Sequence, residues 1–319
     1  MKNSNFDIYQ EVTDRIIAQL EKGVIPWRKP WKVSGIAIKG ATDINRLAFN
    51  RITKTAYSLL NQMLLSHVGE YASFKQWQEL GGTIRKGAKA EIVVFWKWLD
   101  VTKTEKSENE NEPDKVIRAR IPYLHYYQVF HISDVIGVKP LDFKDVKPED
   151  VTENEFDVSE QAENIIQEYA SRENLKIMFE GNEAYYSPML DHVKIPERFK
   201  FDKNTAEYYS TIFHELTHST GAKHRLDRLS RTAYFGSSDY SKEELVAEIG
   251  ASGMLFLLNV ETESSFKNST AYIQSWLEQL RNDKKLIVHA SSQAEKAIRY
   301  IFNGEEQNER QGAEFRPKA

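Results

Sequence analysis

The 319-residue sequence contains no cysteine, so neither disulfides nor thiolate-bound metal ions can contribute to its structure. Any transition-metal site must therefore use His, Asp or Glu ligands. The sequence also lacks a long apolar run, because its most apolar stretch, Met254–Val260, is far too short to span a bilayer. The N-terminal residues Met1–Asp14 are polar and acidic, whereas a signal peptide needs an apolar segment. These absences predict no membrane partner and a cytoplasmic location.

Composition indicates a globular chain with an uneven distribution of charge. Hydrophobic residues make up 40% of the sequence, enough for substantial cores, and the length favours two domains. Residues 1–137 carry 20 Lys and Arg against 15 Asp and Glu, whereas residues 138–319 carry 23 against 32. This asymmetry favours contact with nucleic acid by the first half alone. Ordinary variation between two soluble domains would explain the same numbers.

The first half has the pattern of an α+β domain with a small antiparallel sheet. Apolar residues recur every four positions over Phe6–Lys22, which predicts an amphipathic helix. Two stretches rich in β-branched and aromatic residues, Glu91–Val101 and Val116–Ile132, predict strands. The polar segment between them, Lys103–Lys115, predicts a disordered hairpin loop. The domain spans residues 1–137, and the charged, proline-containing residues 138–157 form a predicted linker.

Aromatic and basic residues alternate at one place in the first half. Trp27 and Trp31 stand among prolines and basic residues, an arrangement that suits stacking on unpaired bases. A structural corner with the tryptophans in the core is an equally good interpretation. Two further loops are basic. The candidate DNA-contact residues are Trp27, Trp31, Arg51, Lys54, Arg85, Lys86 and Lys89.

The second domain, residues 158–319, contains the strongest motif. His214-Glu215-Leu216-Thr217-His218 reads H-E-x-x-H and lies in a predicted helix, Thr205–Ser219, that Gly221 ends as a C-cap. Positions i and i+4 share one face of a helix, so both imidazoles can bind one ion. This is the spacing of zinc hydrolases, in which Glu215 acts as general base on a water molecule. Before this helix, Ala184–Ile195 reads as one strand.

The third metal ligand has two candidates. His224 completes H-E-x-x-H-x-x-G-x-x-H, the metzincin pattern, but Met254 lies in an apolar helical run without the turn that this pattern requires. The alternative is a carboxylate from the next predicted helix, Ser241–Leu258. Glu244 and Glu248 share one face there, so one can bind the ion while the other orients a histidine. A solvated acidic face is the third interpretation of these glutamates.

Motifs over nearly the whole chain carry a family resemblance. In the first half they are Pro26-Trp27-x-x-Pro30-Trp31, Asn50-x-x-Thr53-x-x-x-Tyr57, Leu80-Gly81-Gly82-x-x-Arg85-Lys86-Gly87 and Tyr127-x-Val129-Phe130. In the second half they are Ala184-Tyr185-Tyr186, Ile195-Pro196, HELTHSTG at 214–221, Arg225-Leu226 and Glu243-Glu244-Leu245-x-Ala247-Glu248. In these motifs the sequence resembles ArdC-type antirestriction proteins, which conjugative plasmids and related mobile elements carry. It departs from the family pattern at Lys54, where a glycine usually follows the threonine.

The resemblance implies an N-terminal domain that binds single-stranded DNA, a C-terminal zincin-like metallopeptidase domain, and protection of incoming DNA from restriction. The family pattern does not depend on a histidine at position 224, so it implies Glu244 as the third ligand with Glu248 behind it. Zinc is the expected ion, and another divalent ion is the alternative. The expected partners are single-stranded DNA and a peptide or protein substrate. In a zincin fold an extended substrate pairs with an edge strand over the metal cleft, and both Tyr185–Ser187 and Leu190–Val193 are candidates for that strand.

A different class of function stays open. The metal site could be structural in a non-catalytic interaction protein that blocks restriction by direct contact. The acidic second half would also suit a protein that mimics DNA.

Overall fold

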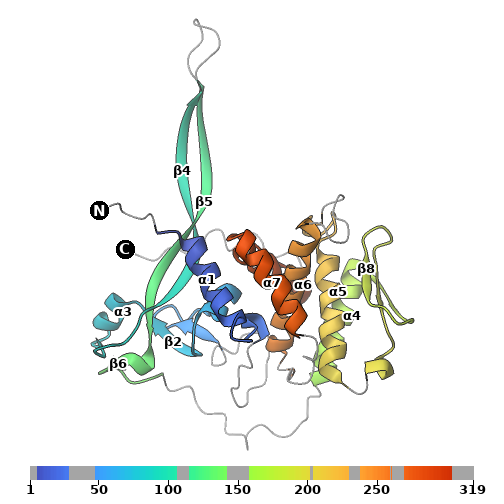
Figure 1. Ribbon diagram of the computed structural model, residues 1–319, viewed down its shortest axis with the longest axis horizontal. Helices are drawn as coiled ribbons and strands as arrows, with labels where there is room; N and C mark the ends of the chain where they lie inside the picture. Colours follow the sequence, from blue (N-terminus) through green and yellow to red (C-terminus); the bar gives the residue numbers. More distant parts are fainter. Residues whose placement is uncertain are drawn as a thin grey trace, which may run out of the picture.

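The computed structural model describes residues 6–28, 47–105, 115–141, 158–201, 204–229, 238–258, 260 and 269–303. Helices and short sheets alternate along these residues, which confirms the α+β class (Figure 1). The predicted linker lies mostly outside the described residues, and Trp31 lies wholly outside them. No helix among the described residues has both the length and the apolar character that crossing a bilayer requires.

Two helices of the first half begin at local capping signals. In α1 (Ile8–Leu20), the Asp7 carboxylate accepts hydrogen bonds from the backbone N–H groups of Tyr9 and Gln10. In α3 (Phe74–Glu79), Ser73 and Gln76 form a reciprocal capping box. The remaining helix of this half is α2 (Leu59–Leu64).

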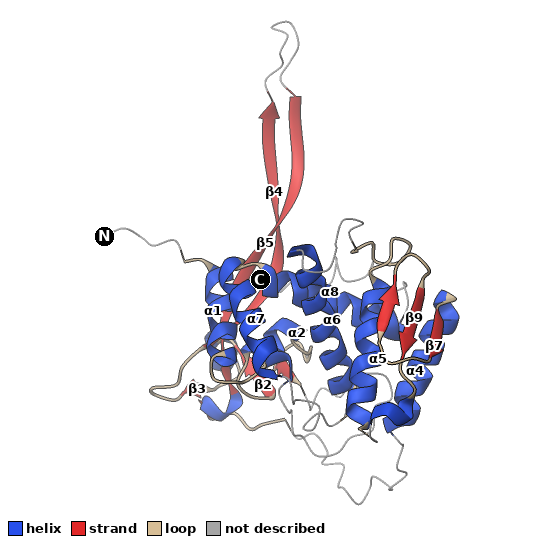
Figure 2. Cartoon of the chain, turned by 45° about the vertical axis from the view of Figure 1, so that its right-hand side comes forward, coloured by secondary structure: helices blue, strands red, loops and turns tan. Residues whose placement is uncertain are grey.

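A four-stranded sheet forms the centre of the first half, in the order β1-β2-β5-β4. The strands are β1 (Ala48–Asn50), β2 (Gly69–Ala72), β4 (Glu91–Glu105) and β5 (Lys115–His131). β2, β5 and β4 are antiparallel as predicted, while β1 pairs with β2 in parallel. β4 pairs over its whole length with residues 115–129 of β5, and the outer part of this two-stranded ribbon extends away from the helices (Figures 1 and 2). A small pair, β3 (Thr83–Ile84) and β6 (Val135–Ile136), lies near its base.

The second half begins with α4 (Val158–Glu173), followed by a three-stranded sheet in the order β7-β9-β8. The strands are β7 (Lys176–Phe179), β8 (Tyr185–Ser187) and β9 (His192–Ile195). The prediction of one strand over Ala184–Ile195 is wrong, because β8 and β9 are antiparallel strands joined by a turn. Asp191 enables this turn with a φ of 45°, in the left-handed region that Asp tolerates better than most residues.

Four longer helices complete the chain: α5 (Thr205–Thr220), α6 (Ser238–Leu257), α7 (Ser269–Asn282) and α8 (Leu286–Asn303). Tyr209, Ile212 and Phe213 of α5 are fully buried against the β7-β9-β8 sheet, α4, α6 and α8 (Figure 2). These apolar residues hold α5 in place, so the histidines on its other side have a fixed position.

The two halves share a core. Ile16 of α1 lies in one buried cluster with Leu245 of α6, Trp276 of α7 and Ile287 of α8. Helices from the second half therefore complete the packing of the first (Figure 1). The domain boundaries at residues 137 and 158 stay predictions.

Candidate metal centre

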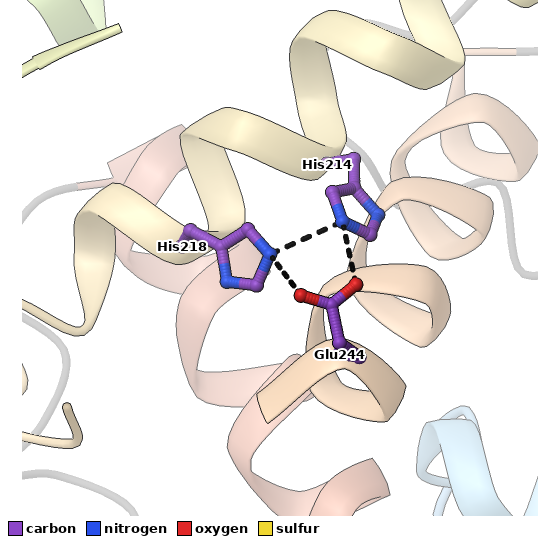
Figure 3. A group of neighbouring side chains, drawn as sticks. All are labelled: His214, His218 and Glu244. Atoms are coloured by element: carbon purple, nitrogen blue, oxygen red, sulfur yellow. Dashed lines mark hydrogen bonds and ion pairs between the residues drawn. The ribbon is translucent and has the colours of Figure 1, made fainter. Parts of the chain in front are cut away.

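Two helices bring three potential ligands together. His214 and His218 lie one turn apart on α5, and Glu244 projects from α6 between them (Figure 3). The two Nε2 atoms are 3.1 Å apart. Glu244 reaches His214 Nε2 at 3.5 Å with one carboxylate oxygen and His218 Nε2 at 3.4 Å with the other.

These distances fit a metal ion. A tetrahedral ion with ligand bonds of about 2.0–2.1 Å sets its ligand atoms roughly 3.3 Å apart. The 3.1 Å between the two Nε2 atoms is close to this value, and the 3.4 and 3.5 Å contacts bring both oxygens of Glu244 to the same place, so a small rotation of the carboxylate would let one oxygen bind an ion held by both rings. Two imidazoles and one carboxylate also leave a fourth position open, as in catalytic sites of this kind.

Glu243, which the sequence reasoning missed, orients one histidine. Its Oε1 lies 3.2 Å from Nδ1 of His218, so a proton on Nδ1 leaves Nε2 free to bind an ion. Arg228 donates two hydrogen bonds of 2.8 Å to the same carboxylate. The signal in the sequence was the doubled glutamate, but only the packing of α6 on α5 shows which carboxylate reaches which ring.

Arg228 also joins this carboxylate to the end of α5. Its guanidinium donates to the Thr217 carbonyl at 2.6 Å and to the Thr220 hydroxyl at 2.9 Å. Gly221 lies at the C-cap, as predicted, but its φ of −77° is not left-handed. Glycine is needed there for space, because an added Cβ would lie 2.8 Å from Leu229 and 3.1 Å from Arg228.

The other two predicted carboxylates lie beside the cluster. Glu248 has one oxygen 3.9 Å from Nδ1 of His214, which is an ion-pair distance and too long for a hydrogen bond. Glu243 hydrogen-bonds the His218 ring, and the expected role of Glu248 behind the ligands stays a prediction. Glu215 is 8% exposed, and no hydrogen bond or ion pair of its side chain is present among the described residues.

His224, the rival third ligand, lies elsewhere. It is 58% exposed, and its Nε2 is 3.2 Å from a carboxylate oxygen of Asp191. Asp191 in turn accepts two hydrogen bonds from the buried Arg225, at 2.8 and 2.9 Å. His224 therefore belongs to the ion-pair network that holds the β8–β9 turn, and Glu244 is the residue that lies with the two histidines.

The charges of the cluster attract a cation. Burial disfavours a charged His218, but hydrogen bonds to Glu243 and Glu244 outweigh it and raise the pKa of His218 to about 10. Burial likewise disfavours a charged Glu244, yet the hydrogen bonds to His214 and His218 lower the pKa of Glu244 below its usual range. The carboxylates are therefore ionised and His218 is protonated when no ion is bound, so a metal ion would replace the proton on Nε2 of His218 while Glu243 holds the proton on Nδ1.

The predicted DNA-contact residues have mixed surroundings. Trp27 is only 5% exposed and packs in the core shared by both halves, so it cannot stack on bases and the structural interpretation of this tryptophan is correct. Arg51 pairs with Glu70, which neutralises its charge. The remaining candidates within the described residues are exposed: Lys54, Arg85, Lys86 and Lys89.

Lys54 is the position at which the sequence departs from the family pattern. Its φ is 58°, in the left-handed region that favours glycine, which is the residue that the pattern usually has there. The lysine keeps the same turn, closed by a hydrogen bond of 2.9 Å from the Lys54 N–H to the Asn50 carbonyl.

Two protein-family models match this chain, one in each half. Residues 6–130 match the model of the N-terminal domain of the anti-restriction factor ArdC. Residues 160–293 match a model described as a zincin-like metallopeptidase, and this range includes all three clustered ligands.

Several relatives match over most of this chain. A Sinorhizobium fredii protein, described as the uncharacterized protein y4eC, is 33% identical over 96% of each chain. A DNA primase TraC of Escherichia coli is 29% identical over 92% of this chain, which spans only 27% of that primase.

Two solved structures are similar along their whole length. The metal-free crystal structure of antirestriction protein ArdC from plasmid R388 has 31% identity and a TM-score of 0.64, covering 93% of this chain and 97% of that one. Its Mn(II)-bound form has 30% identity and a TM-score of 0.65, covering 98% and 100%. Because the similarity, at 31% identity over 93% of this chain, extends through both halves, the chain belongs to the ArdC family of antirestriction proteins.

Proposed function

We propose that this chain is an antirestriction protein that binds a divalent metal ion through His214, His218 and Glu244. The observation that carries the proposal is the convergence of three ligand groups: the two Nε2 atoms lie 3.1 Å apart, and each lies 3.4–3.5 Å from one of the two oxygens of the Glu244 carboxylate. Zinc is the ion expected for two imidazoles and a carboxylate. Mn(II), which the ArdC of plasmid R388 binds, is the alternative, since nitrogen and oxygen ligands also accept it.

The arrangement supports peptide hydrolysis. A divalent ion bound there would act as a Lewis acid, polarising a peptide carbonyl and lowering the pKa of a water molecule. Glu215 accepts the proton of the attacking water on a carboxylate oxygen and delivers it to the leaving amine. Glu243 keeps the His218 ring in one orientation during these transfers, and Arg228 keeps Glu243 in place.

β8 supports the binding of an extended peptide. Among the described strands β8 pairs only with β9, so no described strand covers its outer edge, and it packs next to α5 (Figure 1). A peptide that pairs with the outer edge of Tyr185–Ser187 would lie close to the helix that carries the histidines.

Metal analysis of the purified chain tests the site. We expect about one equivalent of divalent metal in the wild type, and loss of that metal in His214→Ala and in Glu244→Ala. His224→Ala is the matched control. His224 is the rival candidate for the third ligand but lies away from the cluster, so its replacement should leave the metal content unchanged. A metal-free wild type, after incubation with zinc and manganese, would contradict the proposal.

Glu215→Gln separates catalysis from a structural metal. The variant should retain the metal but lose cleavage of denatured casein, because Gln cannot accept the proton. Antirestriction is measured by the plating efficiency of unmodified phage on a restricting host. If Glu215→Gln protects as well as the wild type, the non-catalytic interaction protein becomes the better explanation.

The first half is proposed to bind single-stranded DNA. The net positive charge of residues 1–137 and the exposed Lys54, Arg85, Lys86 and Lys89 support this role. Fluorescence anisotropy with a labelled oligonucleotide should show binding that is insensitive to sequence and weakens steeply with salt. Absence of binding at low salt would refute it.

A further inference from the structure

The β4–β5 ribbon has two faces with different surroundings. Paired residues of an antiparallel ribbon share one face, and successive residues alternate between faces. Val94 and Leu124 thus lie on the face that packs into the helical core. Further out on this same face, the ring of Trp96 lies 6.3 Å from that of His289 in α8. The opposite face therefore points away from these helices.

The opposite face carries a ladder of rings. Tyr123, His125 and Tyr127 occupy alternate positions of β5, with ring centroids 6.1 Å and then 5.0 Å apart. Phe95 of β4 lies 4.7 Å from Tyr127. Lys97 joins the ladder, since its Nζ donates a hydrogen bond of 3.0 Å to the Tyr127 hydroxyl and lies 5.2 Å from the ring centre. We call these five residues the ring face.

The ring face is half-buried at its base, where Phe95 and Tyr127 pack against a second buried cluster, and is exposed toward its outer end. Tyr123 is 39% exposed, and the adjoining Leu99 and Ile121 are 54% and 48% exposed. Lys97 is the one formally charged side chain on this face among the described residues from Val93 to Val101 and the β5 residues paired with them. The opposite face, by contrast, carries the ion pair of Asp100 and Arg120 at 3.3 Å. A cation among aromatic rings, with no carboxylate beside it, complements an anionic ligand with flat apolar groups.

We propose that the ring face is the platform on which unpaired bases of single-stranded DNA stack. This inference rests on the DNA binding proposed above and assigns it a position. Alternate residues of a strand lie about 6.8 Å apart, twice the roughly 3.4 Å step of stacked bases. The ladder thus fits an extended DNA strand in which each base stacks on a protein ring and not on the neighbouring base. A duplex covers its base faces, so single strands bind better.

The test uses the full chain, a fluorescein-labelled oligo-dT, and fluorescence anisotropy over a range of salt concentrations. Tyr123→Ala should weaken binding by at least about fivefold, since it removes one stacking surface. Lys97→Gln should lower the slope of log affinity against log salt by about one. Trp98→Ala is the control, because this tryptophan is 53% exposed on the same strand but on the other face. It should keep its affinity within about twofold.

Each outcome is decisive. If Tyr123→Ala and Lys97→Gln bind the oligonucleotide as tightly as the wild type, the ring face is not the DNA-binding surface. The proposal that the chain binds single-stranded DNA is then unaffected. If the wild type does not bind, both proposals fail. An equal loss in Trp98→Ala overturns the choice of face. If Tyr123→Ala changes only the oligomeric state, the face is a contact between copies of the chain. Tyr123→Leu, which keeps an apolar side chain, checks that any loss comes from the ring and not from unfolding.

Discussion

Glu243 acts on the candidate metal centre without contacting the position of the ion. Its carboxylate lies between the His218 ring and the Arg228 guanidinium, so it fixes both the orientation of the ring and the nitrogen that carries the proton. A neutral amide at this position would bind the ring more weakly and would leave the arginine without its charge partner.

Glu243→Gln should therefore weaken metal affinity by roughly 10-fold to 100-fold, the usual effect of losing such a partner. Affinity is measured by competition with a chelator of known strength. Glu278→Gln, an exposed glutamate on α7, removes the same charge far from the site and should have no effect. An unchanged affinity in Glu243→Gln would show that the contact with His218 is incidental.

Asp191 holds the β8–β9 turn through the fully buried side chain of Arg225. Burial opposes ionisation of Asp191, but hydrogen bonds from Arg225 outweigh it and lower the pKa of Asp191 below its usual value. A folded-state pKa below the unfolded value of about 3.9 means that the ion pair stabilises the fold fully above that pH. The stabilisation is lost as the pH falls through the folded-state pKa.

Asp191→Asn should lower the free energy of unfolding by about 2 kcal/mol at pH 7, because the buried Arg225 loses one of its two carboxylate partners and keeps only Glu173, at 3.1 Å. The difference from the wild type should shrink below about pH 4. Asn tolerates the left-handed backbone at this position, so the turn itself is retained. Urea unfolding at pH 7 and pH 3 measures both values, with Asp100→Asn as an exposed control. An equal loss at both pH values would exclude the ion pair as its cause.

At the scale of the elements, the site exists because α5 and α6 lie very close together. Gly250 of α6 lies against Thr217 of α5, and a Cβ built on this glycine would come within 2.7 Å of two atoms of the threonine side chain. Thr217 is fully buried and hydrogen-bonded to the Phe213 carbonyl, so it cannot move aside. The spacing of the helices, and with it the distance from Glu244 to the histidines, depends on this contact.

Gly250→Ala should therefore separate the two helices, destabilise the protein by about 1–3 kcal/mol and weaken metal binding. Gly253→Ala, one turn further along α6, is the matched comparison. Its Cβ would lie 2.6 Å from the terminal methyl of Ile298, which can rotate away, and at ordinary contact distance from Leu59. Both variants gain the same helix propensity, so the difference between their melting temperatures and metal affinities reports the α5–α6 contact. Equal behaviour of the two variants would refute this explanation.

At the scale of the whole molecule, the first helix of the chain is part of the core beneath the C-terminal helices. Ile16 is fully buried among residues of α6, α7 and α8. The Thr13 hydroxyl donates a hydrogen bond of 2.8 Å to the Lys284 carbonyl, and Lys284 pairs with Asp7 at 2.6 Å. These contacts between distant parts of the sequence predict that the halves unfold together.

Ile16→Ala should lower the free energy of unfolding by about 2–5 kcal/mol and shift the loss of the metal site by the same temperature as the loss of N-terminal structure. Calorimetry and metal release measure the two events on one sample. Ile52→Ala, at a 45% exposed position, should change neither. Metal release at the wild-type temperature in Ile16→Ala would mean that the halves are independent.

The sequence by itself determined what depends on near neighbours. The helix that carries the motif was predicted as Thr205–Ser219 and runs from Thr205 to Thr220, because apolar periodicity and caps act within a few residues. The spacing of His214 and His218 follows from helix geometry alone, and the absence of cysteine restricts any metal ligands to other residue types.

Only the tertiary structure decided which distant groups meet. Glu243 on the His218 ring, Trp27 in the shared core and the ring face of the ribbon all depend on how separate elements pack. Local patterns cannot encode these contacts, because a carboxylate or an indole has the same sequence context whether it faces solvent, a ring or an ion. The packing of α6 on α5 selects among them, and it is set by buried residues such as Gly250 and Thr217.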